Sequence, residues 1–353
     1  MEKRKNIKQC VGIDCGQLEL VCSIAVMAED YSSVMVGGAS FKNTKEGFIK
    51  LEKWVKKHAD SEVPVSFVLE ATGVYHEKIA LHIHTSGAKV SVVLPNKAKA
   101  FFQTLSTKTV TDKTSSQALA QMGLEKLLDS WQPPVPVFAE LKQLTRERTQ
   151  LISERTQCKN QLHAEESGAW PNPSSIKRVK LRIKLLDKQL GEIEKEIQSR
   201  VESNAFLKKK IEYVCSIKGI GLISAITVIA ETNGFNLIRN KKQLVSYAGL
   251  DIVEKQSGTS VHGKSRISRK GNSYIRVAMY LPAIAALRSS PEMMALFKRL
   301  VSKHGIKKKG VIAVSRKLLE LIYVLWKNET KYDIDYYKNK RQETDAPALP
   351  ELA

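Results

Sequence analysis

The sequence has 353 residues, with 57 lysines and arginines against 36 aspartates and glutamates, so its formal net charge is +21 and its pI is about 9.6. This length suffices for about two domains with ordinary cores, and no uninterrupted apolar run approaches the roughly 18 residues that would predict a membrane-spanning helix. Such an excess of positive charge predicts a polyanionic partner, and nucleic acid is favoured over an anionic membrane surface.

The five cysteines, at positions 10, 15, 22, 158 and 215, form no CxxC pair. Neither a zinc site nor a disulfide framework is therefore predicted, and Cys10 and Cys22 are expected to be small apolar residues within strands. The beginning, "MEKRKNIKQC", is charged and does not resemble a signal peptide. These features predict a protein of the reducing cytoplasm without a membrane partner.

The first 130 residues show the periodicity of alternating strands and helices. Three strands as a meander, followed by helices alternating with strands, predict an open mixed sheet covered by helices. In chain order, the predicted elements are two strands within 9–26 around a turn at Gly16, a strand in "SSVMVGGASFKN", a helix at 44–59 with Thr44 as N-cap, a strand at 63–72, a helix ending near Gly87, a strand at 88–95 and a helix beginning near Asp112.

The stretch "WQPPVPVF" at 131–138 is typical of a linker. Two charge-rich helices are predicted after it, at 139–167 and 175–203, because Leu or Ile recurs at intervals of three and four residues. The bend between them is "GAWPNPS" at 168–174. Such a long antiparallel hairpin is either a solvated spacer or a coiled-coil dimerisation arm.

From about residue 206 the composition is again that of a compact domain. In "IKGIGLISAITVIAETNGF", a tight turn at Gly219 and Gly221 precedes an apolar helix. This pattern resembles a helix-hairpin-helix, whose exposed turn amides bind a DNA phosphate beside a cation such as Lys218. The same Gly-Ile-Gly pattern also occurs as an ordinary turn.

Two later segments are strongly basic and contain no acid. The segment 298–317 contains eight basic residues, and a buried closing helix is predicted at 309–328, before a polar tail. The other segment, 264–276, is a candidate phosphate-binding run that contains Lys264, Arg266, Arg269, Lys270 and Arg276.

Three acidic residues lie at the ends of predicted strands or at the start of a predicted helix in the first domain. Asp14 in "CVGIDCGQ" and Glu70 in "VLEAT" each end an apolar strand, and Asp112 begins a helix. If the two strands are neighbours, about 4.8 Å apart, the three carboxylates can share one Mg²⁺ or Mn²⁺ ion. The alternative is that Asp14 caps a turn, Glu70 pairs with a lysine and Asp112 is a helix N-cap.

The order of "GIDCG", "LEATG" and "TDKTSSQALA" resembles the ribonuclease-H fold of RuvC-like Holliday-junction resolvases. Together with "SIKGIGLISAITVIAE", "YAGLDIVEKQSG" and "ISRKGNSYIRVAMY", it resembles the IS one-ten family of insertion-sequence transposases, which includes the pilin-gene invertase. The resemblance covers nearly the whole chain. It implies a RuvC-like acidic catalytic domain at 1–130, a linker and helical hairpin at 131–205, a mainly helical transposase domain at 206–330 and a polar tail at 331–353.

The family pattern in the first domain is Asp, Glu, Asp, Asp. Its first three members fall on Asp14, Glu70 and Asp112, which the resemblance implies are catalytic metal ligands. The fourth belongs three residues after the third, where this chain has Ser115. A hydroxyl supplies no charge, so weakened metal binding is expected, and the chain is a natural variant, an inactive copy or an engineered mutant.

The resemblance implies that Ser257 in "EKQSGTS" is the nucleophile, and Gly258 would let the DNA backbone approach closely. Ser260, Ser265 and Ser268 are the neighbouring rivals. His262 is interpreted as a phosphate contact or a surface residue. Tyr247 in "SYAGL" is interpreted as a packing residue in a helix end.

The resemblance further implies a site-specific recombinase of the prokaryotic nucleoid, guided by a non-coding bridge RNA that pairs with donor and target DNA. It implies two dimers assembled as a tetramer, in which Ser257 of one subunit meets the acids of another. Two other interpretations stay open. One is a metal-dependent resolvase-like nuclease in which water attacks. The other is a nucleic-acid-binding protein whose catalysis has lapsed.

Overall fold

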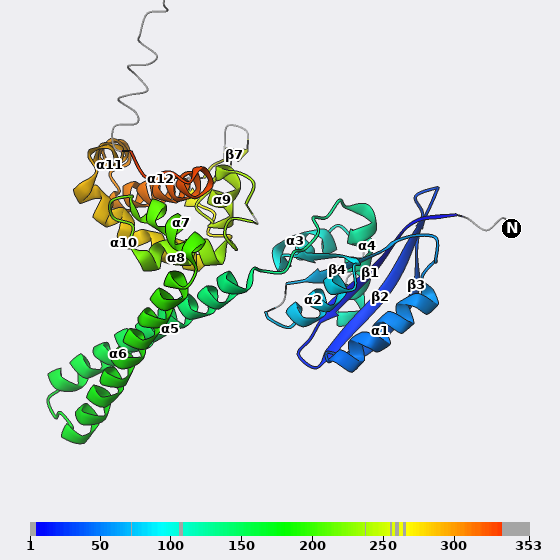
Figure 1. Cartoon of the computed structure of the whole chain (residues 1–353), viewed down its shortest axis with the longest axis horizontal. Coiled ribbons are helices and arrows are strands. Elements are labelled where there is room, and N and C mark those ends of the chain that lie inside the picture. The colour runs from blue at the N-terminus through cyan, green and yellow to red at the C-terminus, as the bar shows by residue number, and fades with distance from the viewer. Residues whose placement is uncertain are drawn as a thin grey trace, which may run out of the picture. The chain divides into compact units, whose positions relative to one another are not determined.

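A computed structural model describes residues 5–333, except 72, 106–108, 237, 255, 258–260 and 264–265, and describes no side chain at 257, 261 or 262. Within it the chain forms two compact units, residues 1–133 and 134–353 (Figure 1). No helix in the described ranges is both long enough and apolar enough to span a bilayer.

The N-terminal unit is built on one five-stranded mixed sheet, as the sequence predicted. Its strand order is β3-β2-β1-β4-β5, with β1, β2 and β3 antiparallel and β1, β4 and β5 parallel. The turn between the first two strands closes at Gly16, whose amide donates to the Glu19 carbonyl over 2.9 Å. The strands are β1 (Asn6–Cys15), β2 (Glu19–Ala28), β3 (Ser33–Lys42), β4 (Val65–Glu70) and β5 (Lys89–Val93).

Helices cover both faces of this sheet. On one face, α1 (Lys45–His58) and α2 (Glu77–Thr85) pack on Val11 and Ile13, and the Thr44 hydroxyl caps α1 as predicted. On the other face, α3 (Pro95–Phe102) and α4 (Asp112–Glu125) pack on Cys10. Successive side chains of a strand point to opposite faces, so Gly12 and Asp14 share the α4 face with Cys10.

Helix α4 approaches β1 more closely than a side chain would allow. A methyl group at Gly12 would overlap the Ser116 carbonyl oxygen and the Ala120 amide, and one at Gly123 would overlap the Cys10 sulfur. Beside this contact the buried hydroxyls of Ser116 and Ser23 are hydrogen-bonded over 2.8 Å. These two glycines therefore fix the height and direction of α4 over the sheet.

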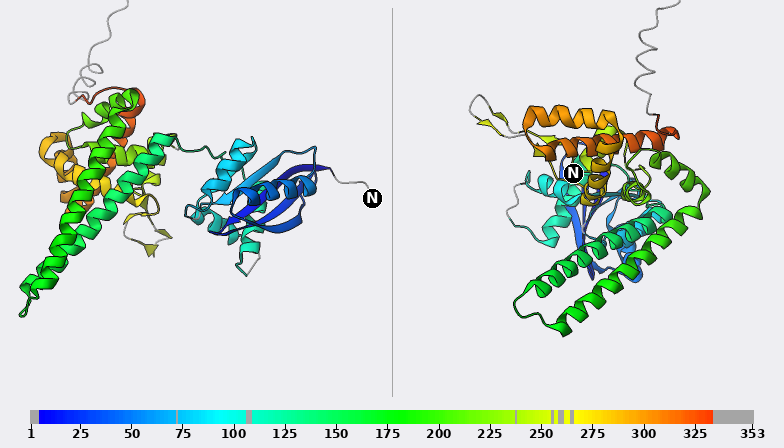
Figure 2. Two further views of the ribbon diagram at one scale, coloured as in Figure 1. Left: turned by 60° about the horizontal axis from the view of Figure 1, so that its bottom comes forward. Right: turned by 90° about the vertical axis from the view of Figure 1, so that its left-hand side faces the viewer.

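The C-terminal unit is helical apart from two short hairpin-like pairs. Two long helices, α5 (Pro136–Ser167) and α6 (Pro173–Glu202), lie side by side in both views of Figure 2. The other helices of this unit are α7 (Ala205–Cys215), α8 (Leu222–Glu231), α9 (Lys241–Tyr247), α10 (Ser273–Ser289), α11 (Pro291–His304) and α12 (Lys307–Asn328). Its strands are β6 (Ile252–Val253), β7 (Gln256–Ser257), β8 (Val261–His262) and β9 (Arg266–Ile267).

The base of the long helix pair belongs to the core of this unit. Leu141 of α5 and Ile197 of α6 are fully buried in the same cluster as Ile226 of α8, Met279 of α10 and Leu319 of α12. Farther along the helix pair, ion pairs join the two helices, between Arg148 and Glu194 at 2.7 Å and between Arg155 and Asp187 at 2.8 Å. Val179, Leu186 and Leu190 of α6 are also buried, so apolar burial continues along the pair and the ion pairs add to it.

We expect Gly12→Ala to destabilise the N-terminal unit by about 2 kcal/mol or more, because the added methyl must displace the α4 backbone. The matched control is Gly38→Ala in β3, where the nearest atom to the added carbon lies at 3.6 Å. Urea unfolding of the full chain, followed by a probe in the N-terminal unit, measures both. Equal stabilities of the two variants would contradict the close contact.

Candidate active site

Two acidic residues occupy equivalent ends of neighbouring parallel strands. Ile13 of β1 pairs with Leu69 of β4, so the next residues, Asp14 and Glu70, lie in register at the carboxyl ends. Val68 packs in the α4 cluster, and by the two-residue alternation Glu70 faces the same side as Asp14. The expectation that these strands are neighbours is confirmed.

The third acidic residue lies at the start of α4, and it does not cap the helix. The Thr111 side chain accepts from the Thr114 amide over 3.2 Å, and the Thr114 hydroxyl accepts from the Thr111 amide over 2.8 Å. This reciprocal capping box makes Asp112 the first helical residue. Gly123 lies against Cys10 and Ser116 lies against Gly12, so α4 runs antiparallel to β1 and its N-terminus lies toward Asp14.

The electrostatics of Asp14 depend on the other three positions. Burial is the largest cause that raises the pKa of Asp14 to about 6, followed by the negative charges of Asp112 and Glu70. Hydrogen bonds from the Cys15 amide and the Ser115 hydroxyl act in the opposite direction and lower this pKa. Ser115 thus contacts the first acidic residue, in the place where the family pattern has a fourth carboxylate.

The donor set fits a hard divalent cation in chemistry. Carboxylate and hydroxyl oxygens are the ligands of Mg²⁺ and Mn²⁺, and the repulsion that raises the pKa of Asp14 is what a bound cation would relieve. In the conformation of the described residues, no three Asp, Glu, His or Cys side chains are close enough to hold one ion. Side-chain rotation would therefore accompany any binding of a cation by Asp14, Glu70 and Asp112.

The predicted nucleophile lies in a separate part of the chain. Ser257 ends the two-residue strand β7, and its backbone pairs with Val261 of β8. The neighbouring predictions Gly258 and Lys264, and the rival serines at 260 and 265, fall outside the described residues. The remaining rival, Ser268, is hydrogen-bonded to the Asp251 carboxylate and accepts from the Lys270 amide.

The basic run divides into exposed and internally bonded residues. Arg266, Arg269 and Lys270 are exposed, and Arg269 has a φ of 54°, a left-handed conformation that costs a non-glycine residue energy. Arg276 instead donates to the carbonyls of Ala248 at 2.8 Å and Gly271 at 3.1 Å. Burial and then Arg269 lower the pKa of Arg276. Arg276 therefore holds the backbone of the run.

The Gly-Ile-Gly turn has a packing reason for its first glycine. Gly219 has a φ of 100°, and a methyl there would lie 3.0 Å from the Ala286 amide nitrogen of α10. Gly221 has open space around it, and it precedes α8 without a side-chain cap. Lys218 beside the turn is exposed. Phosphate binding at this turn stays a prediction.

The sequence analysis missed a buried carboxylate, that of Glu231, which is hydrogen-bonded to Asn272 of the basic run. Glu231 is 2% exposed and accepts two hydrogen bonds from the Arg146 guanidinium, at 2.6 and 2.8 Å, and one from the Asn272 amide at 2.7 Å. Arg146 also lies 4.5 Å from the centre of the Tyr274 ring, and the Tyr247 hydroxyl donates to the Glu231 carbonyl over 2.9 Å.

This Glu231 cluster ties α5, α8, α9 and the start of α10 together. Asn272 is the N-cap of α10, so its position sets where the loop that carries Arg266, Arg269 and Lys270 meets the helix. The interpretation of Tyr247 as a packing residue agrees with its bonds. The sequence does contain a signal for the Glu231 cluster, because an acid ends the apolar run "AITVIAE". A carboxylate buried at such a position requires a hydrogen-bonding or charged partner.

Comparison with known proteins identifies relatives for both parts of the chain. A family model described as transposase IS116/IS110/IS902 family matches residues 211–298, and a DEDD transposase model matches residues 11–165. The pilin gene-inverting protein of Moraxella lacunata is 31% identical over 302 residues, which cover 83% of this chain and 90% of that protein. The pilin gene-inverting protein of Moraxella bovis is 29% identical with the same coverage.

Among solved structures, Thermus thermophilus RuvC aligns with 35% of this chain and 99% of its own length, at 10% identity and a TM-score of 0.28.

The raised pKa of Asp14 predicts a pH dependence of stability. Between the usual aspartate value near 3.8 and about 6, the folded state binds this proton more tightly than the unfolded chain. Stability is therefore lost as the pH rises through this window. In metal-free buffer, we expect Asp14→Asn to remove this slope and to be more stable than the wild type above pH 6. Chemical denaturation at several pH values measures the effect, with the exposed Glu62→Gln as control. A variant that keeps the full slope would contradict the assignment.

Proposed function

The chain belongs to the IS116/IS110/IS902 family of transposases and is a DNA transposase or recombinase. From this premise we propose that it cleaves and rejoins DNA at the ends of an insertion sequence through a covalent phosphoserine at Ser257. The observation that carries the proposal is the gathering of Asp14, Glu70, Asp112 and Ser115 at one end of the sheet. We assign the acidic catalytic domain to 1–130, the linker and hairpin to 131–205, the serine domain to 206–330 and a tail to 331–353.

In the proposed reaction, the Ser257 hydroxyl oxygen forms a bond to the scissile phosphorus. The bond from that phosphorus to the leaving deoxyribose oxygen breaks, and the leaving oxygen takes up the proton that the hydroxyl releases. The phosphodiester is conserved as a phosphoserine ester. A deoxyribose hydroxyl of another strand then displaces the serine, so the strands rejoin without ATP.

Asp14, Glu70 and Asp112 are proposed to hold a Mg²⁺ or Mn²⁺ ion, with Ser115 as a weak or water-mediated fourth ligand. When bound, such an ion stabilises negative charge that develops on the phosphate oxygens. The chain's own exposed cations, Arg266, Arg269 and Lys270, would bind the flanking phosphates, together with Lys264. Gly258 beside the serine would leave room for the DNA backbone.

We propose a bound non-coding RNA as the guide that selects donor and target DNA. The distribution of charge supports this proposal, because the C-terminal unit contains 40 of the 57 basic residues but only 22 of the 36 acidic ones. The net charge of that unit is +18, against +3 for the N-terminal unit. A unit with this charge favours binding of nucleic-acid backbones, which both an RNA guide and a DNA substrate present.

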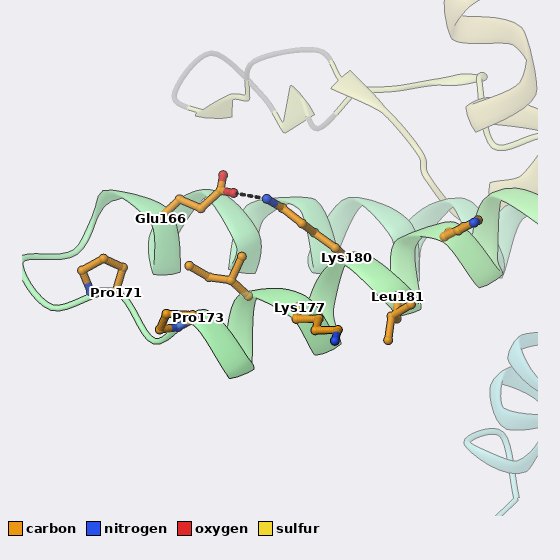
Figure 3. A pocket seen from close by; sticks show the side chains of 8 residues that line it. Glu166, Pro171, Pro173, Lys177, Lys180 and Leu181 are labelled. Carbon is orange, nitrogen blue, oxygen red and sulfur yellow. Dashed lines mark ion pairs between the residues drawn. The ribbon is translucent and has the colours of Figure 1, made fainter.

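We further propose that two dimers form a tetramer and that the site is composite, with Ser257 of one subunit meeting the acidic residues of another. The tip of the long helix pair supports a subunit contact, because Trp170, Leu181 and Leu185 are 94%, 58% and 55% exposed. Figure 3 shows the shallow hollow at this tip, with Lys180 paired to Glu166 at 2.8 Å. Its lining consists of Glu166, Pro171, Pro173, Ile176, Lys177, Lys180, Leu181 and Lys184.

We expect a covalent protein–DNA band on a denaturing gel when the full chain, with its co-purifying RNA, is incubated with Mg²⁺ and DNA spanning the element junction. Ser257→Ala should abolish the band, because it removes the attacking oxygen. Ser115→Asp should increase the band about tenfold or more, because a fourth carboxylate adds charge to the metal site.

The other outcomes of this gel identify the alternatives. Cleaved DNA without an adduct in any lane would favour a resolvase-like nuclease. DNA binding without cleavage, even in Ser115→Asp, would favour a binding protein whose catalysis has lapsed.

Co-expression of Asp14→Asn with Ser257→Ala tests the composite site. Each variant alone lacks one half of the chemistry, so we expect no adduct from either. Mixed oligomers should recover a substantial fraction of the wild-type adduct, because one subunit then supplies the serine and another the acids. Failure to recover any adduct in mixed oligomers, with both variants folded, would place both halves in one subunit.

A further inference from the structure

The basic residues of the C-terminal unit are of two kinds, which differ in whether an acidic partner is present. Along the long helix pair, many cations are in ion pairs, such as Arg148 with Glu194, Arg155 with Asp187 and Lys180 with Glu166. The positive charge there is largely neutralised within the protein. A surface of this kind contributes little to the binding of a polyanion.

The basic residues at the junction of α11 and α12 are of the second kind, without acidic partners in the part of the chain that the structure describes. No acid occurs between Glu292 and Glu320, and within the described residues none of the cations at this junction is in an ion pair. All of these side chains are exposed, and His304 lies among them. We call this surface the basic corner, which consists of Lys298, Arg299, Lys303, Lys307, Lys308 and Lys309.

The basic corner is built on a rigid support. The two helices meet across Gly310, where a methyl would lie about 3.0 Å or less from the Phe297 ring and 3.2 Å from Val301. Gly305, with a φ of 68°, ends α11 through a bond from its amide to the Val301 carbonyl over 2.7 Å. The cations at the end of α11 and the start of α12 are therefore held close together by packing.

An ordinary solvated surface would intersperse the two signs of charge. Arg299 and Lys303 are one turn apart on α11, and like charges at this spacing destabilise a helix by a few tenths of a kcal/mol. Three consecutive lysines then begin α12, at the end of a helix where cations are also unfavourable. An arrangement that repels itself in the free protein gains stability when a polyanion neutralises it.

We propose that the basic corner is a docking surface for the backbone of double-stranded DNA that flanks the reacting phosphate, distinct from the exposed cations beside Ser257. The choice of DNA rests on the proposed function. The corner offers lysines and one arginine without an aromatic side chain exposed among them, so it binds the phosphates of a duplex without reading bases. Its role is to hold the flanks of the substrate while the serine and the acids act.

The test uses the full chain and the triple variant Lys303→Gln, Lys307→Gln, Lys308→Gln. We expect its affinity for a junction-spanning duplex to fall on the order of 10- to 100-fold near physiological salt. The slope of log affinity against log salt should become shallower by about 2 to 3, as expected for three lost phosphate contacts. A duplex of unrelated sequence should show the same loss.

The matched control is Lys53→Gln, Lys56→Gln, Lys57→Gln, which removes three exposed cations from α1 of the N-terminal unit. Equal losses of affinity in the two triple variants would overturn the proposal, because net charge alone would then explain binding. Unchanged duplex affinity in the corner variant would also overturn it. Loss of affinity for a structured RNA with duplex binding intact would assign the corner to RNA instead.

The adduct gel separates this inference from the proposed function. We expect the corner variant to form the Ser257 adduct once the duplex is supplied at saturating concentration, because its reacting groups are intact. An adduct that persists in Ser257→Ala would overturn the proposed nucleophile and leave the corner's binding result standing. A corner variant that binds normally would overturn the corner and leave the nucleophile standing.

Discussion

The contact between α4 and β1 is the constraint on which the acidic site depends. Gly12 and Gly123 allow the helix backbone to lie directly on the strand, and a side chain at either position would lift it away. The buried bond between Ser116 and Ser23 fixes the helix along its axis. Only with α4 at this height does its first turn reach the end of β1, where Asp14 lies beside Glu70 in the register of two parallel strands.

The same contact between α4 and β1 also brings Ser115 within hydrogen-bonding distance of Asp14. The serine reaches Asp14 and donates a hydrogen bond to it, so it lowers the pKa of that carboxyl in the absence of a cation. An aspartate at this position would add a fourth negative charge and raise that pKa further. Without a cation, the donor hydroxyl of Ser115 therefore offsets part of the repulsion that Asp112 and Glu70 exert on Asp14.

The candidate acidic site and most of the positive charge lie in different units. The acidic residues of the candidate site lie in the unit whose net charge is small, and the C-terminal unit carries most of the positive charge. Within that unit, Glu231 shows that burial gives a carboxylate a structural role, because Arg146 and Asn272 satisfy it completely. Arg276 likewise bonds to the backbone, and neighbouring cations stay exposed.

Much of the secondary structure could be predicted from the sequence, because it depends on neighbouring residues. Alternation and apolar runs gave the five strands of the sheet, and Thr44 was recognised as a cap from its place before a periodic helix. Cys10 and Cys22 are buried strand residues, as their apolar surroundings indicated. Helix α3 was missed, since its eight residues, of which Pro95 is the first, contain little periodic pattern.

Family membership, the three acids, Ser115 and the candidate serine could all be recognised in the sequence by itself, because motifs are local in the chain. Only the tertiary structure decided that Ser115 bonds to Asp14 and that Gly219 is required by its contact with α10. It also decided which cations are exposed and which are paired. These outcomes depend on strand register and on the close approach of backbones distant in sequence, and no local pattern of residues encodes either distance.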